Sequence, residues 1–358
     1  MYRRGASDAW LLLGSLPRRA LLNGFVAYAQ QTLEWCTPIW PHVGVVAWRR
    51  IERDDARDLR RILRRTALVH ANTLGIALLL QVLPFRLRVI RRAARRASRF
   101  ANVLSDNRLH AQIVSEQLQS GAALARGSCR RVVAACESLG LAFPPPYVDV
   151  GLWRRRVATA LRRLVDQEVR SHHSLRLLAI FRPPREWCRT WILHRSPTDP
   201  ASVLLGAVLL DVWPLIPDVR GRTMRPPRSN VCDLCGGQHR GALEHGSLES
   251  CFFRCSSLAE PRRLWLRLGR LVAADAGVAA WWDTAVLARA PSSAALVAAL
   301  LAHRAGPRPR VPLAALRHNL TVAFLHAFLP WLHHHRVAID LLCYGHAASP
   351  PSRPEPLL

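Results

Sequence analysis

The chain has 358 residues, half of them apolar, and a formal net charge of +27. This length allows two or three domains with a buried core, and the apolar content excludes a wholly disordered chain. The charge favours a polyanionic partner, either nucleic acid or an anionic membrane surface. All 51 basic residues are arginine. A GC-rich coding sequence would also produce this bias, so codon usage is a second explanation for part of the charge.

The first predicted region, residues 1–143, is helical and basic. A largely apolar helix is expected over residues 21–35. Residues 48–65 predict an amphipathic helix, because apolar residues recur at helical spacing and charged residues fill most other positions. This second segment contains the one adjacent pair of aspartates in the chain, Asp54 and Asp55. We expect both to lie on the charged surface of the helix.

The next segments are an apolar run over residues 74–83 and a basic stretch over residues 85–100. The apolar run is too short to span a membrane and predicts a buried helix. In the basic stretch a narrow apolar stripe alternates with arginines, and no acidic residue offsets their charge. One interpretation is a solvated helix face without a ligand. The other is a helix that contacts nucleic-acid phosphates through Arg86, Arg88, Arg91, Arg92, Arg95, Arg96 and Arg99.

The remainder of the chain predicts further helices. Residues 144–147 (Pro-Pro-Pro-Tyr) predict a linker, and residues 148–228 form an Arg-rich helical connector. Residues 229–346 combine a cysteine cluster with trailing helices, and residues 347–358 form a tail. Because no alternating strand pattern is found, the expected fold class is mainly α, with a small zinc-knuckle subdomain. No export signal and no apolar run of membrane length is present. We therefore expect an intracellular protein, nuclear or cytoplasmic, that does not enter a membrane. The Arg-rich N-terminus leaves a mitochondrial location as a less favoured alternative.

Four of the nine cysteines fall within residues 232–255. Cys232 and Cys235 are separated by two residues and followed by glycine, a spacing at which both sulfurs can bind one metal ion. A closed zinc site needs two more nitrogen or sulfur ligands. His245 can supply one, and Cys251 or Cys255 the other. The spacing therefore predicts a structural Zn²⁺ ion with a Cys3His ligand set.

This window resembles the zinc-binding domain that follows the reverse transcriptase of non-LTR retrotransposons. The family pattern is CxxCG, an acid–His pair, an aromatic run ending in Cys, and then a Trp. The matching residues are Cys232-Asp233-Leu234-Cys235-Gly236, Glu244-His245, Phe252-Phe253-Arg254-Cys255 and Trp265. The chain departs from the pattern at Ser250, where the family has its His, and His245 supplies a His earlier. The aromatic context favours Cys255 as the fourth ligand, with Cys251 as the alternative.

Residues 21–101 look like the thumb and its extension, which follow the catalytic palm in the same reverse transcriptases. The family pattern is an apolar helix with a Tyr, a Trp, an amphipathic helix, a Leu-Pro step and a basic helix. The matching pieces are Tyr28, Trp35 and Trp40, Ile51-Glu52 with residues 57–63, Leu83-Pro84, and residues 86–99. The two resemblances together imply the C-terminal part of a retroelement polyprotein that would grip template or target nucleic acid. The parent polyprotein would be an RNA-directed DNA polymerase.

We expect no enzymatic activity from this chain. A polymerase palm holds two divalent ions with paired carboxylates on a strand–turn–strand. The pair Asp54 and Asp55 lies in a predicted helix, and no aromatic-x-Asp-Asp sequence is present. The leading interpretation is a non-catalytic protein that binds RNA or DNA and carries a structural zinc site. The alternatives are a zinc-stapled protein–protein interaction module and a degenerate retroelement remnant without selected function.

Overall fold

The computed structural model describes residues 16–30, 45–63, 72–106, 112, 128–143, 149–172, 175–195, 199–210, 255–289, 293–302 and 309–334. Most of these residues are helical and none of them lies in a strand, which confirms the mainly α class. The expected zinc-knuckle subdomain falls almost entirely on residues 211–254, outside the described residues. None of the described helices is both long and apolar enough to cross a membrane.

The chain divides into two compact units that each combine segments distant in the sequence. Unit 1 consists of Met1–Arg18, Leu63–Gly75 and His173–Leu358, and unit 2 consists of Arg19–Ile62 and Ile76–His172. The domain boundaries expected near residues 143 and 228 stay a prediction. The first part of the expected connector, as far as His172, belongs to unit 2, because its helix packs against a helix of the N-terminal region.

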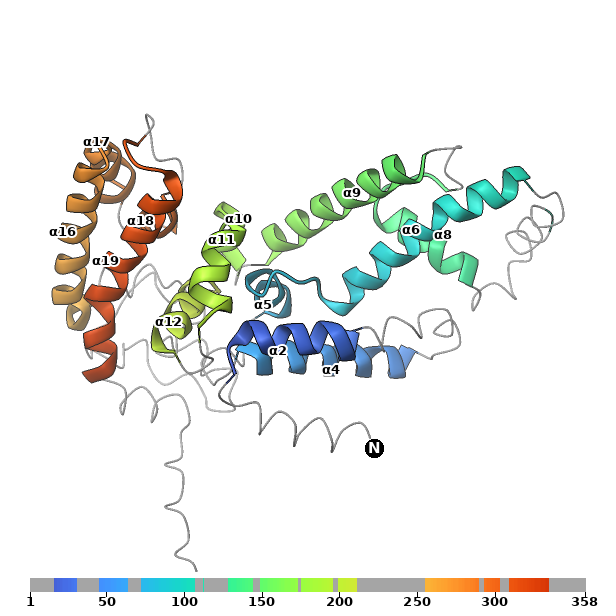
Figure 1. Ribbon diagram of the computed structural model, residues 1–358, viewed down its shortest axis with the longest axis horizontal. Coiled ribbons are helices and arrows are strands. Elements are labelled where there is room, and N and C mark those ends of the chain that lie inside the picture. The colour runs from blue at the N-terminus through green and yellow to red at the C-terminus, as the bar shows by residue number, and fades with distance from the viewer. Residues whose placement is uncertain are drawn as a thin grey trace, which may run out of the picture. The chain divides into compact units, whose positions relative to one another are not determined.

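Unit 2 is built around three helices that lie side by side (Figure 1). They are α6 (Phe85–Asp106), α8 (Ser128–Ser138) and α9 (Val150–Ser171). The amphipathic helix α4 (Val45–Leu63) begins at Val45, upstream of the expected start, because the apolar residues before Trp48 continue the same helix. The chain before it forms α2 (Arg18–Gly24) and the π-helix η1 (Phe25–Gln30), and the chain after it forms α5 (Thr73–Leu79).

Helix α9 has one buried face and one polar face. The carboxylate of Asp149 accepts a hydrogen bond from the backbone N–H of Leu152 and caps the helix start. One apolar stripe at helical spacing is buried: Trp153, Val157, Leu161, Val165 and Val169. The indole N–H of Trp153 donates to the carbonyl of Ala94 in α6 at 2.8 Å. The two helices are therefore held in a fixed register, and the polar face of α9 points away from α6.

Unit 1 holds the C-terminal helices. They are α10 (Arg176–Ile180), α11 (Arg185–Cys188), η6 (Arg189–Leu193), α12 (Pro200–Leu209), η7 (Ser256–Leu258), α16 (Ala259–Asp275), α17 (Ala279–Trp282), η8 (Asp283–Leu287), α18 (Ser293–Leu301) and α19 (Leu313–His334). Helices α16 and α19 lie side by side (Figure 1). Between them the ring of Trp265 meets Phe324 and Phe328, with ring centroids 5.5 and 5.7 Å apart. Edge-on aromatic contacts of this kind add to the burial of apolar area.

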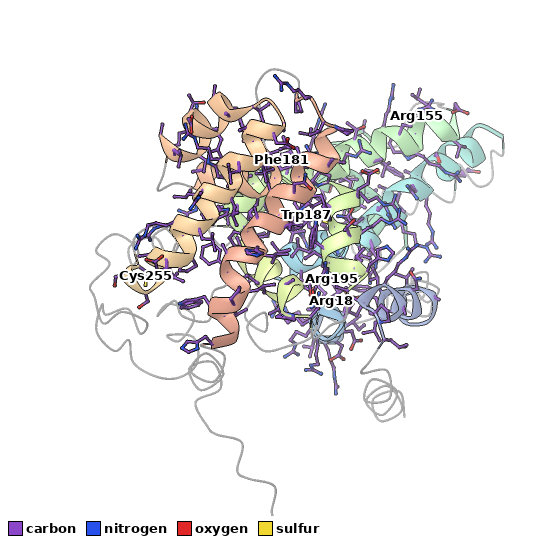
Figure 2. All side chains as sticks on the ribbon, turned by 60° about the vertical axis from the view of Figure 1, so that its left-hand side comes forward. Arg18, Arg155, Phe181, Trp187, Arg195 and Cys255 are labelled. Carbon is purple, nitrogen blue, oxygen red and sulfur yellow. The ribbon has the colours of Figure 1, made fainter. Side chains whose placement is uncertain are left out.

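The guanidinium of Arg18 is buried in unit 1 and joins three segments of it. It donates to the carbonyls of Leu63 and Ile192 at 3.1 and 3.3 Å, and the backbone N–H of Arg18 donates to Arg195 (Figure 2). Burial lowers the pKa of Arg18 to about 10, and the nearby carboxylate of Asp199 partly opposes that shift. Carbonyl acceptors satisfy the donors of this arginine without neutralising its charge.

Candidate nucleic-acid interface and metal ligands

One of the seven arginines predicted to contact phosphate is buried in an ion pair. The guanidinium of Arg88 lies 2.6 Å from the carboxylate of Asp55, and the two side chains are only 3% and 1% exposed. The other carboxylate oxygen of Asp55 accepts a hydrogen bond from the backbone N–H of Phe85, with an N–O distance of 3.0 Å. The guanidinium of Arg88 also donates to the carbonyl of Leu83. The pair therefore ties α4 to the start of α6.

This pair corrects two expectations from the sequence. Arg88 does not belong to an exposed phosphate-binding face, and Asp55 does not lie on the charged surface of its helix. The neighbouring Asp54 is half-exposed and pairs with Arg57 three residues later, as its helical spacing predicts. Helical spacing reveals partners on the same helix, whereas the partner of Asp55 lies 33 residues away in the sequence.

The other arginines of α6 differ in their exposure and in whether they already interact with other residues. Arg86 pairs with Glu168 of α9. Arg91, Arg92 and Arg96 are half-buried and already take part in interactions. Arg95 is exposed, and the side chain of Arg99 lies outside the described residues. Phosphate contact by α6 thus stays a prediction that depends mainly on Arg95.

A larger exposed arginine surface lies on α9, and the sequence prediction did not select it. We call it the α9 arginine face; it comprises Arg154, Arg155, Arg156, Arg162, Arg163 and Arg170, all of them exposed. Figure 2 shows Arg155 on this helix. Within the described part of the chain, none of the six forms an ion pair or a side-chain hydrogen bond. The signal that could have revealed it is the repeat of arginine pairs opposite the apolar stripe of α9.

Two acidic residues of α9 bear on the charge of this face. Glu168 pairs with Arg86 of α6. Asp166 is exposed and stands four residues from Arg162 and Arg170, so it lies on their side of the helix and offsets part of their charge. Six arginines against this one carboxylate still leave a surplus of guanidinium groups, whose planar donors suit the oxygens of a phosphate.

Of the predicted zinc ligands, Cys255 is the one that the structure describes. It is buried directly before η7, at the start of α16 (Figure 2). Its carbonyl accepts hydrogen bonds from the N–H of Leu258 at 3.2 Å and from the guanidinium of Arg262 at 3.3 Å. Burial lowers the pKa of Arg262, and the nearby Cys255 partly opposes that shift. A cation beside a sulfur stabilises the thiolate, which is the form that binds zinc.

The remaining predicted ligands, Cys232, Cys235, His245 and the alternative Cys251, lie outside the described residues. No group of three or more His, Cys, Asp or Glu side chains that could hold a metal occurs among the residues that the structure describes. Cys255 is buried, and its role as a zinc ligand stays a prediction, as does the rest of the zinc site.

These features define a mainly helical protein with an exposed arginine face on one helix. The chain matches no protein-family model, no curated protein and no solved structure, so its resemblance to reverse transcriptases stays a hypothesis.

Proposed function

We propose that this chain is a non-catalytic protein that binds RNA or DNA through the α9 arginine face, with Arg95 of α6 as an additional contact. The observation that carries the proposal is the exposure of six arginines that form no ion pair within the described structure. Guanidinium groups in this state can exchange water and counterions for phosphate oxygens, which is the main source of nucleic-acid affinity.

The opposite face of α9 favours nucleic acid over a membrane surface as the partner. A helix that binds a membrane interface must place its apolar side among the lipids. In α9 that side is buried, with Trp153, Val157 and Val165 each at most 3% exposed. The helix therefore offers a ligand mainly its charged side, which suits a polyanion.

The pairing of Asp55 supports the non-catalytic part of the proposal. Two-metal catalysis needs carboxylate oxygens that are free to bind the ions. Both oxygens of Asp55 accept hydrogen bonds, from Arg88 and from the backbone of Phe85. Recruiting this carboxylate to a metal would leave the charge of Arg88 buried without its partner.

The proposal includes a structural zinc ion held by Cys232, Cys235, His245 and Cys255, with Cys251 as the alternative fourth ligand. Support comes from the ligand spacing, the resemblance to the C-terminal part of a non-LTR retrotransposon reverse transcriptase, and the buried position of Cys255. When bound, the ion would cross-link the preceding segment to the start of α16.

The test of binding is the affinity of the purified chain for a pool of mixed oligonucleotides, measured across a range of salt concentrations. Two triple variants are compared with the unmodified chain. The α9 variant carries Arg155→Gln, Arg162→Gln and Arg163→Gln. The control variant removes the same charge from exposed positions of unit 1, with Arg185→Gln, Arg189→Gln and Arg289→Gln.

For the unmodified chain, the logarithm of the affinity should fall linearly with the logarithm of the salt concentration. The α9 variant should lose about tenfold or more in affinity, and its slope should decrease by about 2–3, since each lost phosphate contact contributes about 0.9. The control variant should retain most of the affinity and most of the slope of its salt dependence. Binding that ignores salt, or no binding at all, would contradict the proposal.

Metal analysis and zinc removal distinguish this proposal from a zinc-stapled protein–protein module. Metal analysis should find about one zinc per chain, lost in Cys255→Ser and retained in Cys251→Ser, because a structural site needs all four ligands. The reverse result would make Cys251 the ligand. If a chelator unfolds the zinc region and the chain shows no nucleic-acid binding with or without zinc, the protein–protein module is the better explanation.

A further inference from the structure

Five of the six exposed arginines of α9 occur at three levels along the helix. Arg155 and Arg156 form the first level, Arg162 and Arg163 the second, and Arg170 the third, at intervals of seven or eight residues. Seven residues are about two helical turns, or about 10 Å at a rise of 1.5 Å per residue. The three levels therefore span about 22 Å on one side of the helix.

From this spacing we propose that α9 binds the sugar–phosphate backbone of a nucleic-acid duplex and does not recognise individual bases. The inference rests on the proposed function and adds the form of the nucleic acid. In B-DNA the major groove separates the two sugar–phosphate backbones by about 12 Å. Levels about 10 Å apart are close to this distance, so successive levels can meet the two backbones.

The levels are held at a fixed spacing by contacts at both ends of the helix. Near its start, Asp149 caps α9 and Trp153 donates to the carbonyl of Ala94. Near its end, Glu168 pairs with Arg86 of α6. A rigid array of charges is preorganised for a partner of equally regular geometry, which a duplex offers and a flexible single strand does not.

Helix α9 also lacks the feature that proteins use to hold single strands. Such proteins stack bases on exposed aromatic side chains. The aromatic residue of α9, Trp153, is buried, and its indole N–H is already hydrogen-bonded. The exposed side of α9 can contact phosphates but offers no surface on which a base could stack.

The pair between Arg86 and Glu168 has a further role in this arrangement. The arginine was predicted to contact phosphate itself, yet it lies beside the carboxylate of Glu168. The pair joins α9 to α6 on the side away from the arginine levels. Arg86 is thus a positioning residue that helps to orient α9.

Contacts with phosphates carry no direct sequence information. We therefore expect binding to depend on the duplex form and on length, and to vary little with sequence. A span of about 22 Å corresponds to about 7 base pairs at 3.4 Å each. Duplexes shorter than this should bind more weakly, because the third level would lack a partner.

The experiment measures the affinity of the full chain for five probes at one moderate salt concentration. They are two unrelated 20-base-pair DNA duplexes, an RNA duplex of the same length, a 20-nucleotide oligo-dT, and phosphatidylserine vesicles. We expect the DNA duplexes to bind at least about tenfold more tightly than oligo-dT, and the two DNA sequences to agree within about threefold. The RNA duplex should bind more weakly than the DNA duplexes, because its A-form major groove is deep and narrow. The vesicles should also bind weakly.

Three variants connect these affinities to α9. The α9 variant should lose about tenfold or more for duplexes, while the control variant should change by less than about threefold. A third variant replaces the same three arginines by lysine and should retain most of the salt slope, because it keeps the charge. Thermal unfolding of all variants should match that of the unmodified chain, since the substituted side chains are exposed.

The outcomes distinguish failure of this inference from failure of the proposed function. Tighter or equal binding of oligo-dT would overturn the duplex inference and leave nucleic-acid binding intact. Duplex affinity that the α9 variant retains would move the site away from α9. Binding of vesicles but of none of the nucleic acids would overturn both proposals.

Discussion

The interiors of the two units accommodate an arginine-rich sequence in different ways. In unit 2, a buried guanidinium is neutralised by a buried carboxylate, Arg88 by Asp55. In unit 1, the buried guanidinium of Arg18 donates to backbone carbonyls. The interior between α16 and α19 is aromatic, and Gly269 allows the ring of Trp282 to approach the helix backbone. The first interior depends on the pairing of two charges, and the second depends on the fit of side-chain volumes. Each should therefore fail for a different reason.

The largest effect should come from breaking the charge pair in unit 2. Asp55→Ala leaves Arg88 buried without its carboxylate and should destabilise the fold by about 3–5 kcal/mol. The matched control is the adjacent Asp54→Ala, whose half-exposed pair with Arg57 should contribute at most about 1 kcal/mol. Chemical denaturation of both variants measures the difference.

A double variant distinguishes the effect of an unpaired buried charge on Arg88 from the effect of lost packing. Asp55→Leu with Arg88→Met removes both charges and should recover a substantial part of the stability that Asp55→Ala loses. Equal destabilisation by Asp54→Ala and Asp55→Ala would show that the pair does not hold α4 to α6.

A smaller effect is expected from adding volume to the aromatic interior of unit 1. A Cβ atom at Gly269 would lie 2.1 Å from the ring of Trp282, so Gly269→Ala must displace that ring. The expected cost is about 1–3 kcal/mol, with a change in tryptophan fluorescence. The control Gly24→Ala has no heavy atom within 4 Å of the new Cβ and should be neutral or slightly stabilising. A neutral Gly269→Ala would mean that this interior adapts to volume.

The smallest effect tests the interior of unit 2 through pH. Burial raises the pKa of Cys136 in α8 from 9.0 to about 11, and Glu137 adds to the shift. The folded state thus keeps the thiol proton at a pH where the unfolded chain has lost it. The contribution of this thiol to the free energy of unfolding is fully present below pH 9 and is lost as the pH rises toward 11.

At pH 10.5 this loss should be about 1–2 kcal/mol. Cys136→Ala lacks the thiol, so its deficit relative to the unmodified chain should shrink between pH 8 and pH 10.5. Thermal unfolding of both proteins at the two pH values measures this. A deficit that stays constant would show that water reaches the thiol in the folded state.

Local patterns in the sequence predicted the helices well, because helical periodicity depends on neighbouring residues. The apolar stripe of α6 is buried at Leu87, Ala94 and Ala97, and residues 48–65 are helical as far as Leu63. The expected helix over residues 21–35 divides into α2 and η1 within its described part. The helix α17 and its continuation η8 were not predicted, because together they are too short to show a clear period.

The amino-acid sequence by itself determined the mainly helical class, the excess of arginine and the ligand types of the proposed zinc site. Only the tertiary structure decided which arginines remain available to a ligand. It assigned Arg88 to Asp55 and Arg86 to Glu168, and it left the arginines of α9 exposed. The physical reason is that an ion pair between distant segments depends on how helices pack, whereas the charge of a helix face is visible from its own residues. The arginine-rich surface that the sequence predicted on α6 is therefore proposed for α9.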